Sequence, residues 1–109
     1  MVDRSLEWVY SVDAARGAVK ACHTEGLRSR IFNIGMGEIY SSRELVDMVK
    51  RLVPGARLKT GSPPKASNLA PRETEAPCDI TSSREELGYE PDYKMEPAVK
   101  DFLEFLKRR

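Results

Sequence analysis

The sequence predicts a small α/β (α+β) domain in which short strands pack against three or four helices. Apolar side chains alternate with polar ones near the N-terminus and form a short run at residues 30–34, as expected of strands. Three longer segments repeat their apolar residues at helical spacing and carry start signals. With 109 residues the chain has the size of one domain, 1–109, with one modest core.

Residues 6–12 are the first expected element. Apolar side chains alternate along it with more polar or smaller ones, at Leu6, Trp8, Tyr10 and Val12. Such alternation is typical of a half-buried strand. The spacing of Leu6, Val9 and Tyr10 also suits a helix that continues into the next element, so both interpretations stay open. Asp13 follows as a good N-cap, because its carboxylate can accept hydrogen bonds from the free amides of the next turn.

The helix after Asp13 has a narrow stripe of mostly small side chains, which permits close approach to a sheet. The stripe consists of Ala14, Ala15, Ala18, Val19 and Cys22. Gly26 is expected to end this helix. Residues 30–34 then form a short apolar strand, which the Gly35-Met36-Gly37 sequence interrupts.

Ser41 and Glu44 have the spacing of a capping box, which predicts the start of a second helix. We expect this helix to bury Leu45, Met48, Val49, Leu52 and Val53. It should stop at Pro54-Gly55, and residues 56–60 are compatible with another short strand.

A proline-rich loop is expected at residues 61–77, where Pro63, Pro64, Pro71 and Pro77 interrupt the pattern. Loops of this length are usually functional or disordered. Beyond it, Thr81 or Ser82 should cap a short helix, and Gly88 should end it with a left-handed residue. The last helix begins near Met95, has Pro97 in its first turn, and carries Met95, Val99, Phe102, Leu103 and Leu106 on one face.

Composition excludes several kinds of partner. The 18 lysines and arginines balance 17 acidic residues, and no basic run is interleaved with aromatics, so no nucleic-acid partner is expected. The basic end 107–109 instead complements a helix dipole. No stretch reaches the roughly 18 apolar residues of a membrane span, so we expect a soluble protein without a membrane partner. The use of cysteine predicts a cytoplasmic location. Cys22 and Cys78 are interpreted as reduced, buried residues, although sequence alone leaves a disulfide open.

Few residues suit catalysis or phosphate binding. His23, the one histidine, is interpreted as an exposed surface residue, and no second ligand lies at metal spacing. Gly35-Met36-Gly37 lacks the further glycine and lysine of phosphate loops, so a turn with positive φ is the better interpretation. Asn33 is expected to pin that turn through its side chain. Arg72 presents a planar fork suited to two phosphate oxygens, and the alternative is a solvated loop arginine.

Four stretches of the chain follow one another in a familiar order. They are residues 8–17 (WVYSVDAARG), residues 32–38 (FNIGMGE), the capped helix from Ser41, and residues 79–91 (DITSSREELGYEP), with Glu96 shortly after. Together they resemble the C-terminal substrate-binding part of NAD-dependent epimerase/dehydratases. These enzymes are the extended branch of the short-chain dehydrogenase/reductases and act on nucleotide sugars. The resemblance covers almost the whole chain.

The catalytic residues of that family have no counterpart in this chain. The family binds NAD at a glycine-rich turn and uses a Tyr-x-x-x-Lys pair. Here the residues four positions after the four tyrosines are Ala14, Glu44, Tyr93 and Pro97. The resemblance therefore implies a lobe without the Rossmann half, with no cofactor of its own (NAD serves the full-length family) and no assignable catalytic residue.

Arg72 gains support from the resemblance, because in many family members an arginine in this loop contacts the substrate diphosphate. Here Glu73 and Glu75 follow it, where the family often has a Pro-Gly-Asp turn. Two carboxylates so close repel a diphosphate unless they point away from it. The solvated alternative therefore stays open.

The resemblance predicts a nucleotide-sugar-binding lobe that is inactive by itself, with a nucleotide sugar and the Rossmann lobe as partners. The second hypothesis is a free-standing, non-enzymatic binding or oligomerisation module derived from that lobe. Such a module would expose the apolar face that normally meets the other lobe, and exposed faces of this kind favour self-association.

Overall fold

The computed structural model describes residues 4–61 and 76–109. It contains a two-stranded antiparallel sheet and four helices, so the predicted fold class is confirmed. The strands are β1 (Ser5–Glu7) and β2 (Ile39–Ser41), paired with Leu6 opposite Tyr40. The helices are α1 (Ser11–His23), α2 (Ser42–Leu52), α3 (Thr81–Leu87) and α4 (Met95–Arg108).

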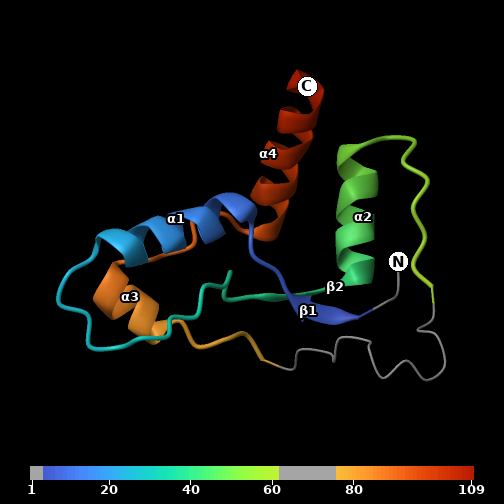
Figure 1. Ribbon diagram of the computed structural model, residues 1–109. Helices are drawn as coiled ribbons and strands as arrows, with labels where there is room; N and C mark the ends of the chain where they lie inside the picture. The colour runs from blue at the N-terminus through green and yellow to red at the C-terminus, as the bar shows by residue number, and fades with distance from the viewer. Residues whose placement is uncertain (1–3, 62–75) are drawn as a thin grey trace.

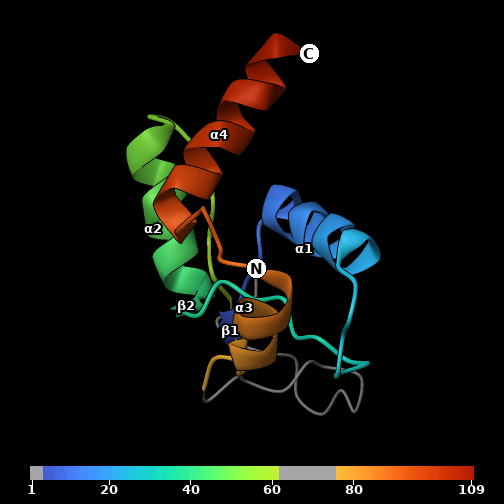
Figure 2. The same ribbon diagram turned by 90° about the vertical axis from the view of Figure 1, so that its left-hand side faces the viewer.

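The elements form two groups (Figures 1 and 2). The first group contains the sheet and helices α2 and α4, which lie next to each other. The second group contains helices α1 and α3, which pack against each other. Each group has its own small core. The first contains Met36, Met48 and Met95, and the second contains Ile80, Leu87 and Tyr89. The one modest core expected from the sequence is thus divided in two.

Helix α2 confirms its predicted start. The Ser41 hydroxyl accepts a hydrogen bond from the Glu44 amide at 3.1 Å, and the Glu44 carboxylate accepts one from the Ser41 amide at 2.7 Å. Its amphipathic pattern turns Val46 and Met48 inward. Val53 is the C-cap, and Pro54-Gly55 follows as predicted.

The first element differs from the prediction. Strand β1 ends at Glu7 and helix α1 begins at Ser11, so the alternation over residues 6–12 spans a strand, a connection and a helical turn. Asp13 is not the N-cap: Tyr10 holds that position without a side-chain hydrogen bond. The Asp13 carboxylate is buried and accepts hydrogen bonds from a distant segment instead.

Helix α1 also packs through a different face from the one predicted. Ala15, Ala18, Val19 and Cys22 are exposed. The buried face contains Asp13 and Gly17. A Cβ at Gly17 would lie 2.7 Å from Ile34 Cδ1, so a larger residue here would force the Ile34 side chain to shift. The helix ends at His23 with Thr24 as C-cap, before Gly26.

Two predicted strands are wrong. Residues 30–34 and 56–60 are irregular, because neither run has a partner strand among residues 4–61 and 76–109.

In the second half of the chain, α3 begins without a hydroxyl cap. Asp79 Oδ1 accepts a hydrogen bond from the Thr81 amide at 2.9 Å, whereas the sequence predicted that the hydroxyl of Thr81 or Ser82 would cap the helix. Gly88 ends α3 with φ 62°, as predicted.

Helix α4 begins at Met95 and has Pro97 in its first turn, as predicted. Its apolar face is buried only at the start. Met95 lies in the core, whereas Phe102, Phe105 and Leu106 are 46–48% exposed. Within the described parts of the chain, most of the apolar residues in the C-terminal half of this helix are therefore exposed, although Leu103 is half-buried.

Candidate functional site

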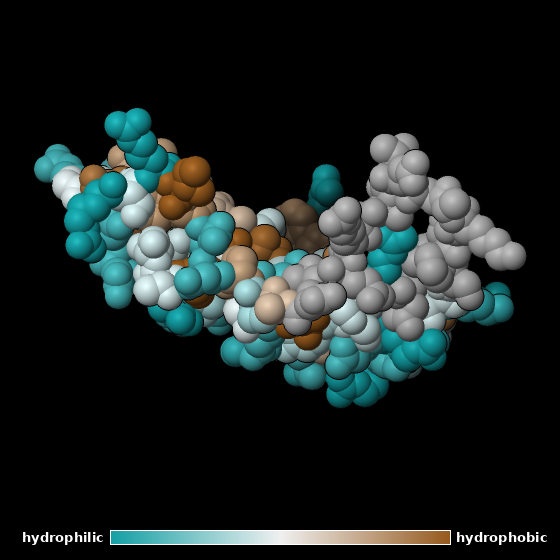
Figure 3. Space-filling view, turned by 90° about the horizontal axis from the view of Figure 1, so that it is seen from below, coloured by the Kyte–Doolittle hydropathy of each residue, from teal (hydrophilic) through white to brown (hydrophobic). Residues whose placement is uncertain are grey.

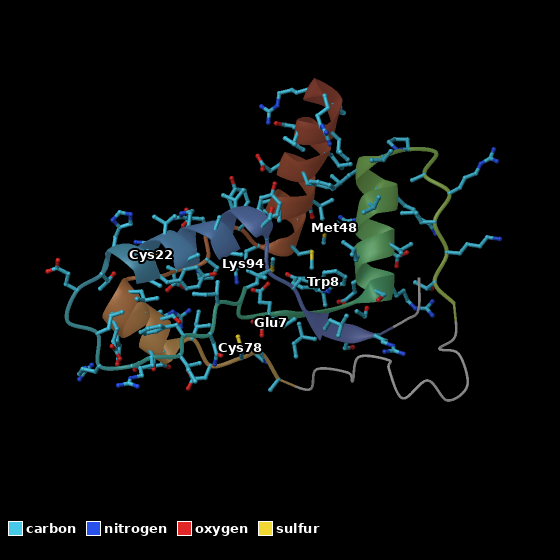
Figure 4. The ribbon with its side chains drawn as sticks, viewed as in Figure 1. Glu7, Trp8, Cys22, Met48, Cys78 and Lys94 are labelled. Atoms are coloured by element: carbon cyan, nitrogen blue, oxygen red, sulfur yellow. The ribbon has the colours of Figure 1, made fainter. Side chains whose placement is uncertain are left out.

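Glu7 forms a junction between three segments at the end of β1. Its Oε1 accepts a hydrogen bond from the Gly37 amide at 3.0 Å, and its Oε2 accepts one from the Cys78 amide at 2.6 Å. Figure 4 places Glu7 and Cys78 together below the connection from β1 to α1. The carboxylate thus joins β1, the Gly35-Met36-Gly37 turn and the segment that leads into α3.

Two glycines favour the geometry of this junction for different reasons. Gly37 has φ +77°, which confirms the predicted turn with positive φ. At Gly35, a Cβ would lie 2.3 Å from Glu7 Oε1 and 2.6 Å from Cys78 Sγ. Because the Glu7 carboxylate already holds the Gly37 amide, this turn presents a negative charge where a phosphate loop would offer free amides.

The environment of the junction shifts the acidity of two groups in opposite directions. Burial raises the pKa of Glu7, but hydrogen bonds from Cys78 and from the Gly37 and Met36 amides outweigh it, so that this pKa is lowered. Burial and the Glu7 carboxylate raise the pKa of the Cys78 thiol to about 11. Cys78 therefore stays protonated at neutral pH, which makes it a poor nucleophile.

Asp13 forms a second junction, in the other group of elements. Its oxygens accept hydrogen bonds from the Asp92 amide at 3.2 Å and the Tyr93 amide at 3.0 Å. Arg16 donates to Asp13 at 3.2 Å and also pairs with Asp92. The Asp13 side chain is 1% exposed. Its hydrogen bonds fix the segment between α3 and α4 against α1. Sequence reasoning found Asp13 but assigned it the wrong partner.

An apolar groove lies between α4 and the connection from β1 to α1. Its volume is about 360 Å³, and its lining includes Trp8, Val9, Met95, Val99 and Phe102. The lining contains no lysine, arginine or carboxylate. Because a diphosphate needs cationic or amide donors, this groove suits apolar side chains rather than the phosphates of a nucleotide sugar.

Among residues 4–61 and 76–109, the sequence candidates do not come together in one site. Arg72 and most of the loop 61–77 lie outside the described residues, and nothing in the structure tests the role of Arg72. His23 is exposed at the end of α1, as predicted. Cys22 is exposed too, contrary to the prediction, and both cysteines are free. Asn33 donates to the Asp79 carbonyl at 2.9 Å, which ties the turn region to the start of α3.

The tyrosines do not form a pair with lysine in the described residues. Tyr10 donates to Asp101 and Tyr40 donates to Glu38, each at 2.5 Å. Both hydrogen bonds raise the pKa of the phenol to about 12. Tyr89 donates to the Gly35 carbonyl at 3.0 Å. In the described parts of the chain, no cluster of histidine, cysteine and carboxylate residues suits a metal ion.

Comparison with known proteins shows which enzymes the sequence of this chain is similar to. The chain is 32% identical over 92 residues to the UDP-glucose 4-epimerase of Corynebacterium glutamicum, covering 80% of the chain and 26% of that enzyme. The chain is homologous to one part of the nucleotide-sugar 4-epimerases. The resemblance predicted from the sequence is confirmed at this level, whereas no family model matches the chain.

Solved 4-epimerase structures share the fold of this segment. A UDP-glucuronic acid 4-epimerase from Bacillus cereus, in complex with UDP-glucuronic acid and NAD, matches 96% of the chain with a TM-score of 0.74 at 23% identity. The same enzyme in complex with NAD matches with a TM-score of 0.69 at 21% identity. The chain spans 32% of the length of these enzymes. None of the helices in the described residues has the length and apolarity to cross a membrane.

Proposed function

We propose that the chain is the nucleotide-sugar-binding part of a 4-epimerase-like enzyme and has no epimerase activity by itself. The observation that carries the proposal is the homology to one segment of UDP-glucose 4-epimerase. A likeness of fold to an enzyme bound to UDP-glucuronic acid and NAD supports it. In a complete enzyme this part would close over the sugar nucleotide while NAD in another lobe removes and returns a hydride.

Arg72 is the proposed ligand of the substrate diphosphate. It precedes Cys78 by six residues, and the Glu7 junction holds Cys78 in place. Arginine can form two parallel hydrogen bonds to a diphosphate, which makes it the best candidate in this loop. The proposal expects no NAD site in this chain, since the chain has neither the glycine-rich turn nor a Tyr-x-x-x-Lys pair.

A thermal-shift series tests this function. UDP-glucose and UDP-glucuronic acid should raise the Tm of the wild-type chain, and Arg72→Ala should abolish most of that rise. Arg57→Ala is the matched control, because Arg57 is also an exposed arginine and has no partner in the described residues. Equal stabilisation of wild type and Arg72→Ala would remove Arg72 as a ligand. Micromolar binding of NAD to the chain would contradict the proposal that NAD binds only in another lobe.

A second candidate function is a non-enzymatic assembly module derived from this segment. The exposed apolar side chains of α4 and α1 favour it, namely Phe102, Phe105, Leu106, Val12 and Val19. Apolar areas interrupt the hydrophilic surface on the face shown in Figure 3 as well. This function predicts concentration-dependent self-association in sedimentation velocity. Purely monomeric behaviour at all concentrations would argue against it.

A further inference from the structure

An apolar strip runs along the C-terminal half of α4 and continues onto the start of α1. Phe102 and Phe105 lie one turn apart on α4, and their rings stack with centroids 6.4 Å apart. Val9 and Val12 extend the strip to the connection after β1 and the first turn of α1. Each of these four side chains is 40–48% exposed within residues 4–61 and 76–109. In Figures 1 and 2 the C-terminal end of α4 extends beyond α1 and α2.

The strip borders two hollows that differ in charge. The first is the apolar groove described above, which has no charged side chain in its lining. The second has a volume of about 230 Å³ and shares Phe102 with the first. Its lining contains one carboxylate and one guanidinium, those of Asp101 and Arg108, together with Phe105. An occupant of the second hollow therefore needs apolar groups and charges of both signs.

Both charged side chains have capacity for a further partner. Asp101 accepts a hydrogen bond from the Tyr10 hydroxyl at 2.5 Å, and a carboxylate has room for several donors. Arg108 forms no ion pair with any other residue that the structure describes. The two residues are seven positions apart, which is two helical turns or roughly 10 Å along α4. They therefore lie on the same side of the helix.

This arrangement of charges is self-complementary. In a pair of identical chains related by a two-fold axis, residue i contacts residue j of the second copy, and residue j contacts residue i. When two α4 helices lie antiparallel with the axis level with Phe105, Asp101 of each copy faces Arg108 of the other. The phenylalanine side chains then meet between the two ion pairs. The interface thus combines an apolar centre with a charged rim.

We propose that the occupant of this strip is a second copy of the chain, with the two α4 helices antiparallel and Asp101 of each copy paired with Arg108 of the other. This inference rests on the second candidate function, the assembly module, and names its partner and its contact. The charges favour a second copy, because one helix presents both signs at equal distances from the two-fold axis. Four half-exposed apolar side chains cover much less than the roughly 800 Å² that each partner buries in a standard interface. The dimer is therefore weak and reversible.

Charge reversal at the two positions tests this contact. Arg108→Glu and Asp101→Arg should each weaken self-association at least tenfold, because each variant places like charges at both symmetry-related contacts. An equimolar mixture of the two variants should recover the wild-type affinity, since both contacts of the mixed pair join opposite charges. Sedimentation velocity over a concentration series measures all of these affinities. A purely structural role of Asp101 in holding Tyr10 predicts no recovery in the mixture.

Lys107→Glu is the matched control. It changes the net charge by the same amount as Arg108→Glu and lies in the same exposed last turn of α4. Lys107 is two positions beyond Phe105 and hence on the opposite side of the helix. This variant should keep the wild-type affinity, and both variants should have the same Tm.

Each outcome decides a different question. Loss of affinity in the single variants with recovery in their mixture supports the contact. Self-association that Arg108→Glu and Lys107→Glu weaken equally, or a mixture without recovery, overturns the inference and leaves the assembly function intact. A wild-type chain that stays monomeric at all concentrations overturns both. A monomeric chain whose complex with the N-terminal part of the Corynebacterium glutamicum UDP-glucose 4-epimerase is weakened by Phe105→Ala would instead assign the strip to a second lobe.

Discussion

Glu7 illustrates how much one side chain does in this small fold. Its carboxylate accepts amide hydrogen bonds from residues 30 and 71 positions away along the chain. Asp13 has the same role for positions 79 and 80 residues away. Both side chains join distant segments that are not paired in a sheet, because the sheet formed by residues 4–61 and 76–109 has only two short strands.

Glu7→Gln should destabilise the chain by about 1.5–3 kcal/mol at pH 7, since it removes charge-assisted hydrogen bonds. The pKa of Glu7 is lowered in the folded state, so its contribution is full above the unfolded pKa of about 4.3. The contribution disappears as the pH falls through the lower, folded pKa. Urea unfolding of both proteins across this range measures the difference. Glu25→Gln should change little, because Glu25 is exposed and its carboxylate has no partner among the residues that the structure describes.

The two thiols should react at very different rates. Cys78 is half-buried, and its pKa of about 11 keeps it protonated near neutral pH. Cys22 is exposed. At pH 8, iodoacetamide should therefore modify Cys22 at least tenfold faster than Cys78, as measured by mass spectrometry. Denaturation should abolish the difference, and equal rates in the folded chain would contradict the Glu7 junction.

At the scale of elements, local signals were sufficient for some helix boundaries and not for strands. The Ser41 and Glu44 capping box and the left-handed Gly88 depend on neighbours in the sequence, and both were predicted. The strand at residues 30–34 depends on a partner strand, which the described residues do not provide. The inward face of α1 depends on the approach of Ile34 to Gly17, which no local pattern reveals.

The capping of α2 and α3 gives a matched test of this distinction. Ser41→Ala should cost about 0.5–2 kcal/mol of unfolding free energy, because Ser41 caps α2 through the Glu44 amide. Ser82→Ala should stay within about 0.5 kcal/mol, since Ser82 is exposed and caps nothing in the structure. Chemical denaturation measures both. An equal loss in the two variants would contradict the assigned caps.

At the scale of the whole molecule, the described residues form a flat rather than spherical body, with principal extents of 49 × 39 × 20 Å. Its radius of gyration of 16.3 Å exceeds the roughly 13 Å of a compact domain of this length. The two separate small cores and the exposed apolar end of α4 agree with this extended shape. These features suit a segment that is stabilised further by a second lobe.

The candidate site was only partly predictable, because its contacts join segments that are far apart in the sequence. The sequence motifs identified the related enzymes, because residues such as Asp13 and Gly88 stand at fixed offsets in the chain. They did not reveal that Glu7 connects Gly37 with Cys78, since that contact joins segments far apart in sequence. Arg72, the proposed diphosphate ligand, rests on its sequence position alone.

The most direct test of the account is an NMR titration of the isotope-labelled chain with UDP-glucose. We expect saturable shifts of the amide signals of Cys78 and of the loop that contains Arg72, and much smaller shifts with glucose alone. Absence of any saturable shift at millimolar UDP-glucose, from a chain whose spectrum shows it to be folded, would contradict a nucleotide-sugar-binding role.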